Sequence, residues 1–134
     1  MFKIKNVYLK EAAELLFNLT LKGKQSRHRT KLVNIMSDRL KEVEEQRVKL
    51  AKEYSYVDEK GNPKEENGRF QIEDHVGFQN EVEELFNEHL VVEGEDNRIM
   101  LQTVADALLK TDEEFSGQEA QVYDYLCQQF EDAK

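Results

Sequence analysis

The residues best placed to bind another molecule through charge are the Lys and Arg side chains of residues 22–31. Five of these ten residues are Lys or Arg, and none is acidic. Ammonium and guanidinium groups bind carboxylates and phosphates, so the run is a candidate contact site for a protein or a nucleic acid. A helix beginning near residue 27 would add the positive end of its backbone dipole. The candidate partner-binding residues are Lys24, Arg27, Arg29 and Lys31.

The charge distribution favours some partners over others. The 134 residues carry 19 Lys and Arg and 28 Asp and Glu, a net charge of -9. Residues 1–50 contribute +6 (12 basic, 6 acidic) and residues 51–134 contribute -15 (7 basic, 22 acidic). A particle of net charge -9 repels phosphate at long range. The acidic half of the chain, within one fold or in another copy, is therefore favoured over nucleic acid as the partner of the basic run.

Nucleic-acid binding through residues 22–31 stays open as a weaker alternative. The run contains no Phe, Tyr or Trp, and single-strand binding relies on aromatic side chains interleaved with cations. Two acidic runs offer a different alternative, since spaced carboxylates can imitate phosphates and block the basic groove of a host nucleic-acid-handling or defence protein. The ordinary reading of such runs is a solvated face. The first acidic run is Glu81, Glu83, Glu84 and Glu88, and the second is Asp112, Glu113 and Glu114.

Residue patterns typical of catalysis and cofactor binding do not occur in this sequence. There is no Gly-rich phosphate loop, and the three histidines are far apart with no metal-ligand spacing. Ser26 and Ser116 lack the glycine context of a nucleophile elbow and are better explained as helix caps. Cys127 is the lone cysteine and is interpreted as a packing residue. We expect no catalytic residues, no metal ligands and no cofactor.

One long amphipathic helix, predicted over residues 27–54, must position the basic run. Its apolar residues recur in a heptad-like pattern, and Arg47 interrupts them. A helix of this length either protrudes from so small a domain or packs along another copy. Arg47 then either fixes the register of that contact or extends to its rim. The expected self-association residues are Leu32, Met36, Leu40, Val43, Arg47 and Leu50.

Shorter elements flank this helix in the predicted fold. The fold class is α+β and predominantly helical, in a single domain of residues 1–134 with a small antiparallel β element. No apolar stretch approaches the twenty residues of a membrane span. The expected elements before residue 74 are a strand at 2–4, a helix at 7–21 closed by Gly23, and a break at 57–68 that forms a loop or a loose hairpin running into Phe70 and Ile72. The later ones are a helix capped by Asp74, a hairpin of 90–92 with 99–101, a short helix at 104–109, and a last helix opened by the capping box Ser116–Glu119.

Three segments carry a family resemblance. They are Leu21-Lys22-Gly23-Lys24-Gln25-Ser26-Arg27-His28-Arg29-Thr30, Asp58-Glu59-Lys60-Gly61-Asn62-Pro63 with Asn67-Gly68-Arg69-Phe70, and Glu114-Phe115-Ser116-Gly117-Gln118-Glu119-Ala120. Together they resemble an uncharacterised family of small phage and prophage proteins of Gram-positive bacteria, over nearly the whole chain. The resemblance implies a phage-encoded product that acts in the bacterial host cytoplasm or in a virion. It implies no catalytic assignment.

These observations together predict a non-enzymatic interaction or assembly protein of phage origin that associates with itself. Its partners are expected to be further copies of the chain and a phage or host protein, with no membrane contact. The acidic inhibitor of a host nucleic-acid-handling or defence protein is the main alternative.

Overall fold

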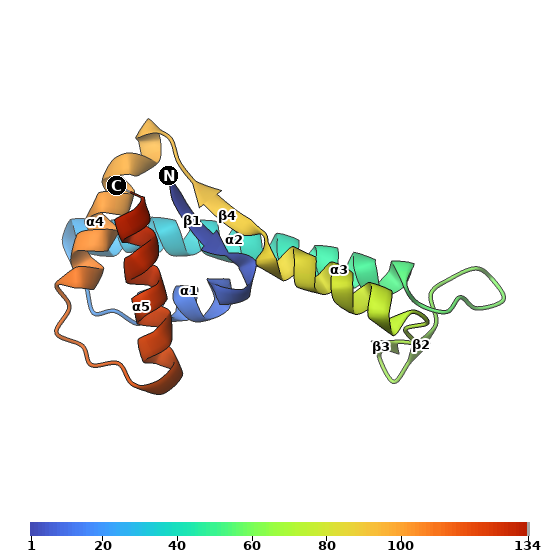
Figure 1. Ribbon diagram of the computed structural model, residues 1–134. Coiled ribbons are helices and arrows are strands. Elements are labelled where there is room, and N and C mark those ends of the chain that lie inside the picture. Colours follow the sequence, from blue (N-terminus) through green and yellow to red (C-terminus); the bar gives the residue numbers. More distant parts are fainter. Residues whose placement is uncertain (134) are drawn as a thin grey trace.

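The computed structural model describes residues 1–133 as a body from which a two-helix arm projects (Figure 1). The fold is α+β and predominantly helical, as predicted. Helix α2 (Gly23–Glu53) runs through both parts. The body adds β1 (Phe2–Lys5), the short 3-10 helix η1 (Asn6–Tyr8), α1 (Leu9–Phe17), β4 (His89–Val92), α4 (Glu95–Leu109) and α5 (Gly117–Asp132). The arm adds α3 (His75–Asn87) and, near its tip, the hairpin of β2 (Glu65–Glu66) and β3 (Arg69–Phe70).

Helix α2 is long because nothing in its sequence stops it. No Gly or Pro occurs between Lys24 and Glu53, and apolar residues recur at helical spacing throughout. Its 31 residues extend about 46 Å at 1.5 Å per residue. The body covers only the first half of that length, so the second half continues into the arm (Figure 1).

The body is built on an antiparallel pair formed by the beginning of the chain and a late strand. Phe2 pairs with Val92 and Ile4 with Leu90. Phe2 and Ile4 are completely buried among residues of α1, α2, α4 and α5, and the Phe2 ring stacks on Phe130 with centroids 4.6 Å apart. The two chain ends meet here, because the Met1 amino group lies 3.5 Å from the carbonyl oxygen of Ala133.

The predicted hairpin of residues 90–92 with 99–101 is wrong. Residues 90–92 belong to β4, whose partner is β1, and residues 99–101 lie inside α4. Gly94, the residue just before α4, has φ +96°, a backbone conformation that favours glycine. The helix that follows buries Met100, Val104 and Leu108, which share one face at steps of four residues.

Three predicted helix caps also differ from the structure. Helix α1 ends at Phe17, so Gly23 does not close it; instead Gly23 opens α2 with φ +62°. Ser26 therefore lies inside the first turn of α2, because the helix begins before residue 27. Ser116 does precede α5, but its side chain makes no capping hydrogen bond.

The arm is an antiparallel helix pair closed by a turn-rich tip. Helix α3 packs along the second half of α2, and Val43 and Ala51 of α2 and Leu85 of α3 are buried. Asp74 caps α3, as predicted, by accepting a hydrogen bond of 2.9 Å from the backbone N–H of Gly77. The predicted loose hairpin is also confirmed, with β2 and β3 joined by Asn67 and Gly68, which both have positive φ.

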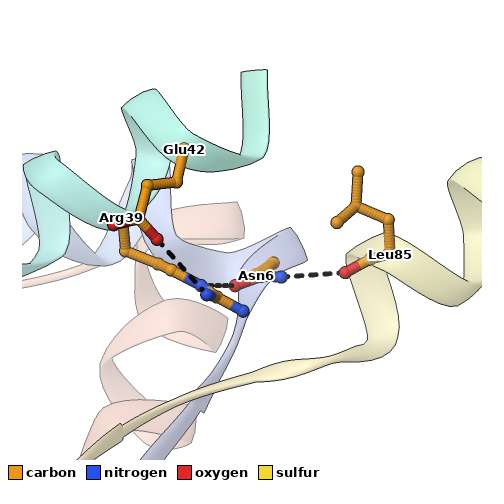
Figure 2. A network of polar contacts seen from close by, with 4 residues as sticks. All are labelled: Asn6, Arg39, Glu42 and Leu85. Atoms are coloured by element: carbon orange, nitrogen blue, oxygen red, sulfur yellow. Dashed lines mark hydrogen bonds and ion pairs between the residues drawn. The ribbon is translucent and has the colours of Figure 1, made fainter. Parts of the chain in front are cut away.

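A buried asparagine joins the body to the arm (Figure 2). Asn6 is only 1% exposed. Its Nδ2 donates to the carbonyl oxygen of Leu85 at 2.8 Å, and its Oδ1 accepts from Nε of Arg39 at 3.1 Å. Its backbone N–H donates to the carbonyl oxygen of Glu88 at 2.9 Å. The end of α3 is thereby satisfied by hydrogen bonds from the body.

Replacing this side chain is expected to destabilise the fold. Asn6→Ala removes a buried donor and acceptor and leaves their partners unpaired, which costs about 1–3 kcal/mol of unfolding free energy. Urea denaturation followed by circular dichroism measures the loss. The matched control is Asn80→Ala at an exposed position of α3, where about 0.5 kcal/mol or less is expected. Equal stability of the two variants would show that the Asn6 network is not a structural link.

Candidate interaction surfaces

Three of the four predicted partner-binding residues form an exposed row on α2. Lys24, Arg27 and Lys31 are spaced by three and four residues, so their side chains lie on one helix face, and each is exposed. Within residues 1–133 the ion pairs join Arg39 to Glu42, Arg47 to Glu44 and Arg98 to Glu95. The three cations of this row are in none of them and have no carboxylate partner. We call Lys24, Arg27 and Lys31 the basic row. The unpaired N–H groups at the start of α2 add to its positive potential.

Arg29, the fourth predicted residue, is engaged inside the chain. Its guanidinium donates to the carbonyl oxygens of Leu16, Phe17 and Leu19 at 2.9, 3.1 and 2.7 Å. These carbonyls belong to the end of α1 and the segment after it, where helix carbonyls lack intrahelical partners. Arg29 therefore holds α1 against α2, and its predicted role in partner binding stays a prediction.

The predicted self-association stripe is largely used by the chain itself. Leu32, Met36 and Val43 are at most 2% exposed, because α1, α3 and α4 pack against α2. Leu40 and Leu50 are half-buried. A second copy is therefore not needed to cover this stripe, and the three buried residues are unavailable to it. Self-association itself stays a prediction, and the partly exposed members of this stripe, Leu40, Arg47 and Leu50, remain available to it.

Arg47 pairs with its own helix. Its guanidinium donates to the two carboxylate oxygens of Glu44 at 2.7 and 3.0 Å, and its side chain is 40% exposed. This hydrogen bond lowers the pKa of Glu44. Arg47 therefore occupies the rim position that the sequence allowed, and its partner lies three residues away in the same helix.

An acidic groove lies along the arm between α2 and α3. It has a volume of about 250 Å³ and is floored in part by Leu50 and Leu85. Four carboxylates and one ammonium group line it, which gives a net charge of -3. We call this surface the acidic groove. Its lining residues are Gln46, Lys49, Leu50, Glu53, Glu81, Glu84, Leu85 and Glu88.

Sequence reasoning identified only one wall of this groove. The acidic run supplies Glu81 and Glu84 of α3 and Glu88 just after it, while Glu83 of the same run does not line the groove. The opposite wall on α2 was missed, because nothing in the sequence specifies that the second half of α2 packs on α3. The signal that could have found it is the apolar periodicity shared by the two segments, which ends in Leu50 and Leu85.

The second acidic run serves the body. Asp112, Glu113 and Glu114 lie in the loop between α4 and α5, and Oε1 of Glu113 accepts a hydrogen bond of 3.0 Å from the backbone N–H of Thr20. This contact ties the α4–α5 loop to the segment between α1 and α2. Glu113 is thus engaged with the chain's own backbone.

Exposed apolar side chains include a group at the arm tip and several around a hollow on the body. At the arm tip, Tyr56, Val57 and Val76 are 49%, 61% and 71% exposed. On the body, a hollow of about 660 Å³ lies beside α4 and the end of α5, with Leu109 and Phe130 in its lining and Glu93 and Asp106 also present. Both are places where another molecule could pack apolar groups. Neither surface was predicted from the sequence.

The described part of the chain offers no metal cluster. Among residues 1–133, no group of three or more His, Cys, Asp or Glu side chains is placed to hold a metal ion. Cys127 is half-buried, and this burial raises the pKa of its thiol, which fits a packing role. Within the same residues, no helix has the length and apolar character to cross a bilayer. Comparisons with family models, with curated proteins and with solved structures find no match to this chain.

The different roles of Arg27 and Arg29 lead to opposite expectations for one substitution. Arg29→Ala should lower the unfolding free energy by about 1–2 kcal/mol, because it removes charge-assisted hydrogen bonds to three carbonyls. Arg27→Ala, the matched control on the exposed face, should change it by about 0.5 kcal/mol or less. Thermal or urea unfolding of the two variants measures the difference. If Arg29→Ala is as stable as Arg27→Ala, the contact with α1 contributes nothing to the fold.

Proposed function

We propose that the chain is a non-enzymatic interaction protein that assembles with copies of itself. The observation that carries the proposal is the separation of unpaired opposite charges along one helix. The basic row lies at the start of α2, and the acidic groove lies beside its end. Arg27 and Lys49 are 22 residues apart, about 33 Å along the helix axis at 1.5 Å per residue.

This separation keeps the two surfaces from neutralising each other within one chain. Exposed charges interact over about 8 Å at physiological ionic strength, and the row and the groove are several times farther apart. Contact between copies removes that limit, because the row of one molecule can reach the groove of another. Complementary charge of this kind fixes orientation and speeds association.

Phage origin is part of the same proposal and is supported by the three segments that resemble small phage and prophage proteins. We place the protein in the bacterial host cytoplasm or in a virion on that basis. A phage or host protein is the second expected partner. The exposed apolar side chains at the arm tip and around the body hollow are the surfaces that suit such a partner.

One alternative is favoured by a specific observation. The carboxylates of the acidic groove lie on a projecting arm, so they could enter the basic cleft of a host nucleic-acid-handling or defence protein as phosphate mimics. In that case the acidic groove would bind a foreign protein and the basic row would have no part in it. Reversing the charge of the basic row would then leave capture of the host protein unchanged.

Self-association is tested by mass in solution. Light scattering at tens of micromolar and low salt should give a mass above the 15.8 kDa of one chain. The mass should fall as salt is added, because the opposing charges are exposed and become screened. A mass of 15.8 kDa at every concentration and salt level would contradict the proposal.

Nucleic acid is expected not to bind. A gel shift with mixed single- and double-stranded DNA and RNA at physiological salt should show no retardation at about 1 μM protein, because three cations on a chain of net charge -9 give a weak and salt-sensitive contact. The control is the variant with Lys24, Arg27 and Lys31 changed to Glu. Retardation of the wild-type chain that this variant abolishes would assign the basic row to nucleic acid.

A further inference from the structure

We propose that two copies form an antiparallel, two-fold symmetric dimer in which the basic row of each copy lies in the acidic groove of the other. This inference rests on the proposed self-association and adds the surfaces that meet and the symmetry that relates them. The occupant of the acidic groove is a second copy of the chain, because one chain carries both the basic row and the acidic groove but cannot bring the two together.

The two surfaces have matching charge spacing. The cations of the basic row occur at Lys24, Arg27 and Lys31, which are steps of three and then four residues. The groove is lined by Glu81 and Glu84 of α3 and by Glu88, the extended residue that follows the helix, with the same sequence steps in the same order. When α2 of one copy lies parallel to α3 of the other, Lys24 and Arg27 lie opposite Glu81 and Glu84 in register, and Lys31 lies opposite Glu88 just past the end of α3. If α2 of one copy instead ran antiparallel to α3 of the other, steps of three and four would face steps of four and three, and the charges would not align.

The row and the groove also open on the same side of α2. Lys49 lines the groove and follows Lys31 by 18 residues, which is about five turns of 3.6 residues. Glu53 lines the groove and follows Lys24 by 29 residues, about eight turns. Residues separated by whole turns project from the same face of a helix. A single face of the molecule therefore presents both the row and the groove.

This arrangement gives a closed dimer, in which both contacts form at once. Helix α3 runs antiparallel to α2, so a partner α2 that lies parallel to α3 runs antiparallel to the first α2 (Figure 1). The row and the groove are about 33 Å apart along α2 in both copies. When the row of one copy reaches its partner's groove, the partner's row consequently reaches the first groove. The contact is the same in both directions, as two-fold symmetry requires.

The chemistry of the groove suits the row. The groove carries -3 net and the row carries +3, so the charges balance at each contact. The aliphatic stems of Lys and Arg can lie on Leu50 and Leu85 while their charged ends reach the carboxylates. Lys49 is the one cation in the groove lining, and it is outnumbered by four carboxylates.

The test is a charge exchange between two variants. The first carries Lys24→Glu, Arg27→Glu and Lys31→Glu, and the second carries Glu81→Lys, Glu84→Lys and Glu88→Lys. Each variant alone opposes like charges at both contacts and should dimerise at least about tenfold more weakly than wild type. An equimolar mixture restores opposite charges at both contacts and should form a heterodimer of twice 15.8 kDa. A matched control, Lys10→Glu with Lys60→Glu and Lys110→Glu, should dimerise as wild type.

A crosslink provides a second and more local readout. In a Cys127→Ser background, Arg27→Cys combined with Glu84→Cys should give a covalent dimer under mild oxidation, whereas Lys10→Cys combined with Glu84→Cys should not. This pair of single substitutions keeps the test usable if a triple reversal fails to fold.

The outcomes separate the inference from the proposed function. A wild-type dimer that neither triple reversal weakens overturns the paired-groove contact and leaves self-association standing. A wild-type chain that is monomeric throughout overturns both. Assemblies larger than a dimer, restored by mixing the two variants, overturn the two-fold arrangement and indicate head-to-tail growth. Capture of a basic host protein by the groove, with no dimer, assigns the groove to inhibition.

Discussion

The length of α2 is the constraint on which the rest of the structure depends. A helix of about 46 Å exceeds the body that two strands and three further helices build around its first half. Its second half would expose an apolar stripe to water, and α3 covers that stripe as the other half of the arm. The chain must then return from the arm tip to the body, and β4 makes this return by pairing with β1. Arm, tip and strand pair thus follow from one uninterrupted helix.

Polar side chains secure the places where this long helix meets shorter elements. Asn6 closes the end of α3 at the junction of arm and body, and Arg29 closes the end of α1 near the start of α2. Both satisfy carbonyls that a helix end leaves without partners. The basic row and the acidic groove lie on exposed surfaces toward opposite ends of α2. The proposed pairing of two reversed copies depends on this separation.

The sequence predicted the elements whose cause is local and missed those whose cause is distant. The long helix was predictable because its periodicity is continuous and no Gly or Pro interrupts it. The partner of β4 was not, because β1 lies at the other end of the chain and any β-prone neighbour satisfies a local pattern. Arg27 and Arg29 have the same chemistry, but side chains two residues apart on a helix point about 200° apart, so only one can face solvent while the other faces α1. Only one wall of the acidic groove was recognisable in the sequence, because that wall is a run of Glu while the α2 wall depends on tertiary packing.

The meeting of the two chain ends has a practical consequence for how the molecule can be tethered. The Met1 amino group and Ala133 occupy one corner of the body, and the arm tip lies at the far end of the molecule (Figure 1). A tag, a surface anchor or a fused domain at either end therefore leaves from the same corner. Immobilised by that corner, the molecule presents its arm outward, and the choice of end does not change the direction in which the arm points.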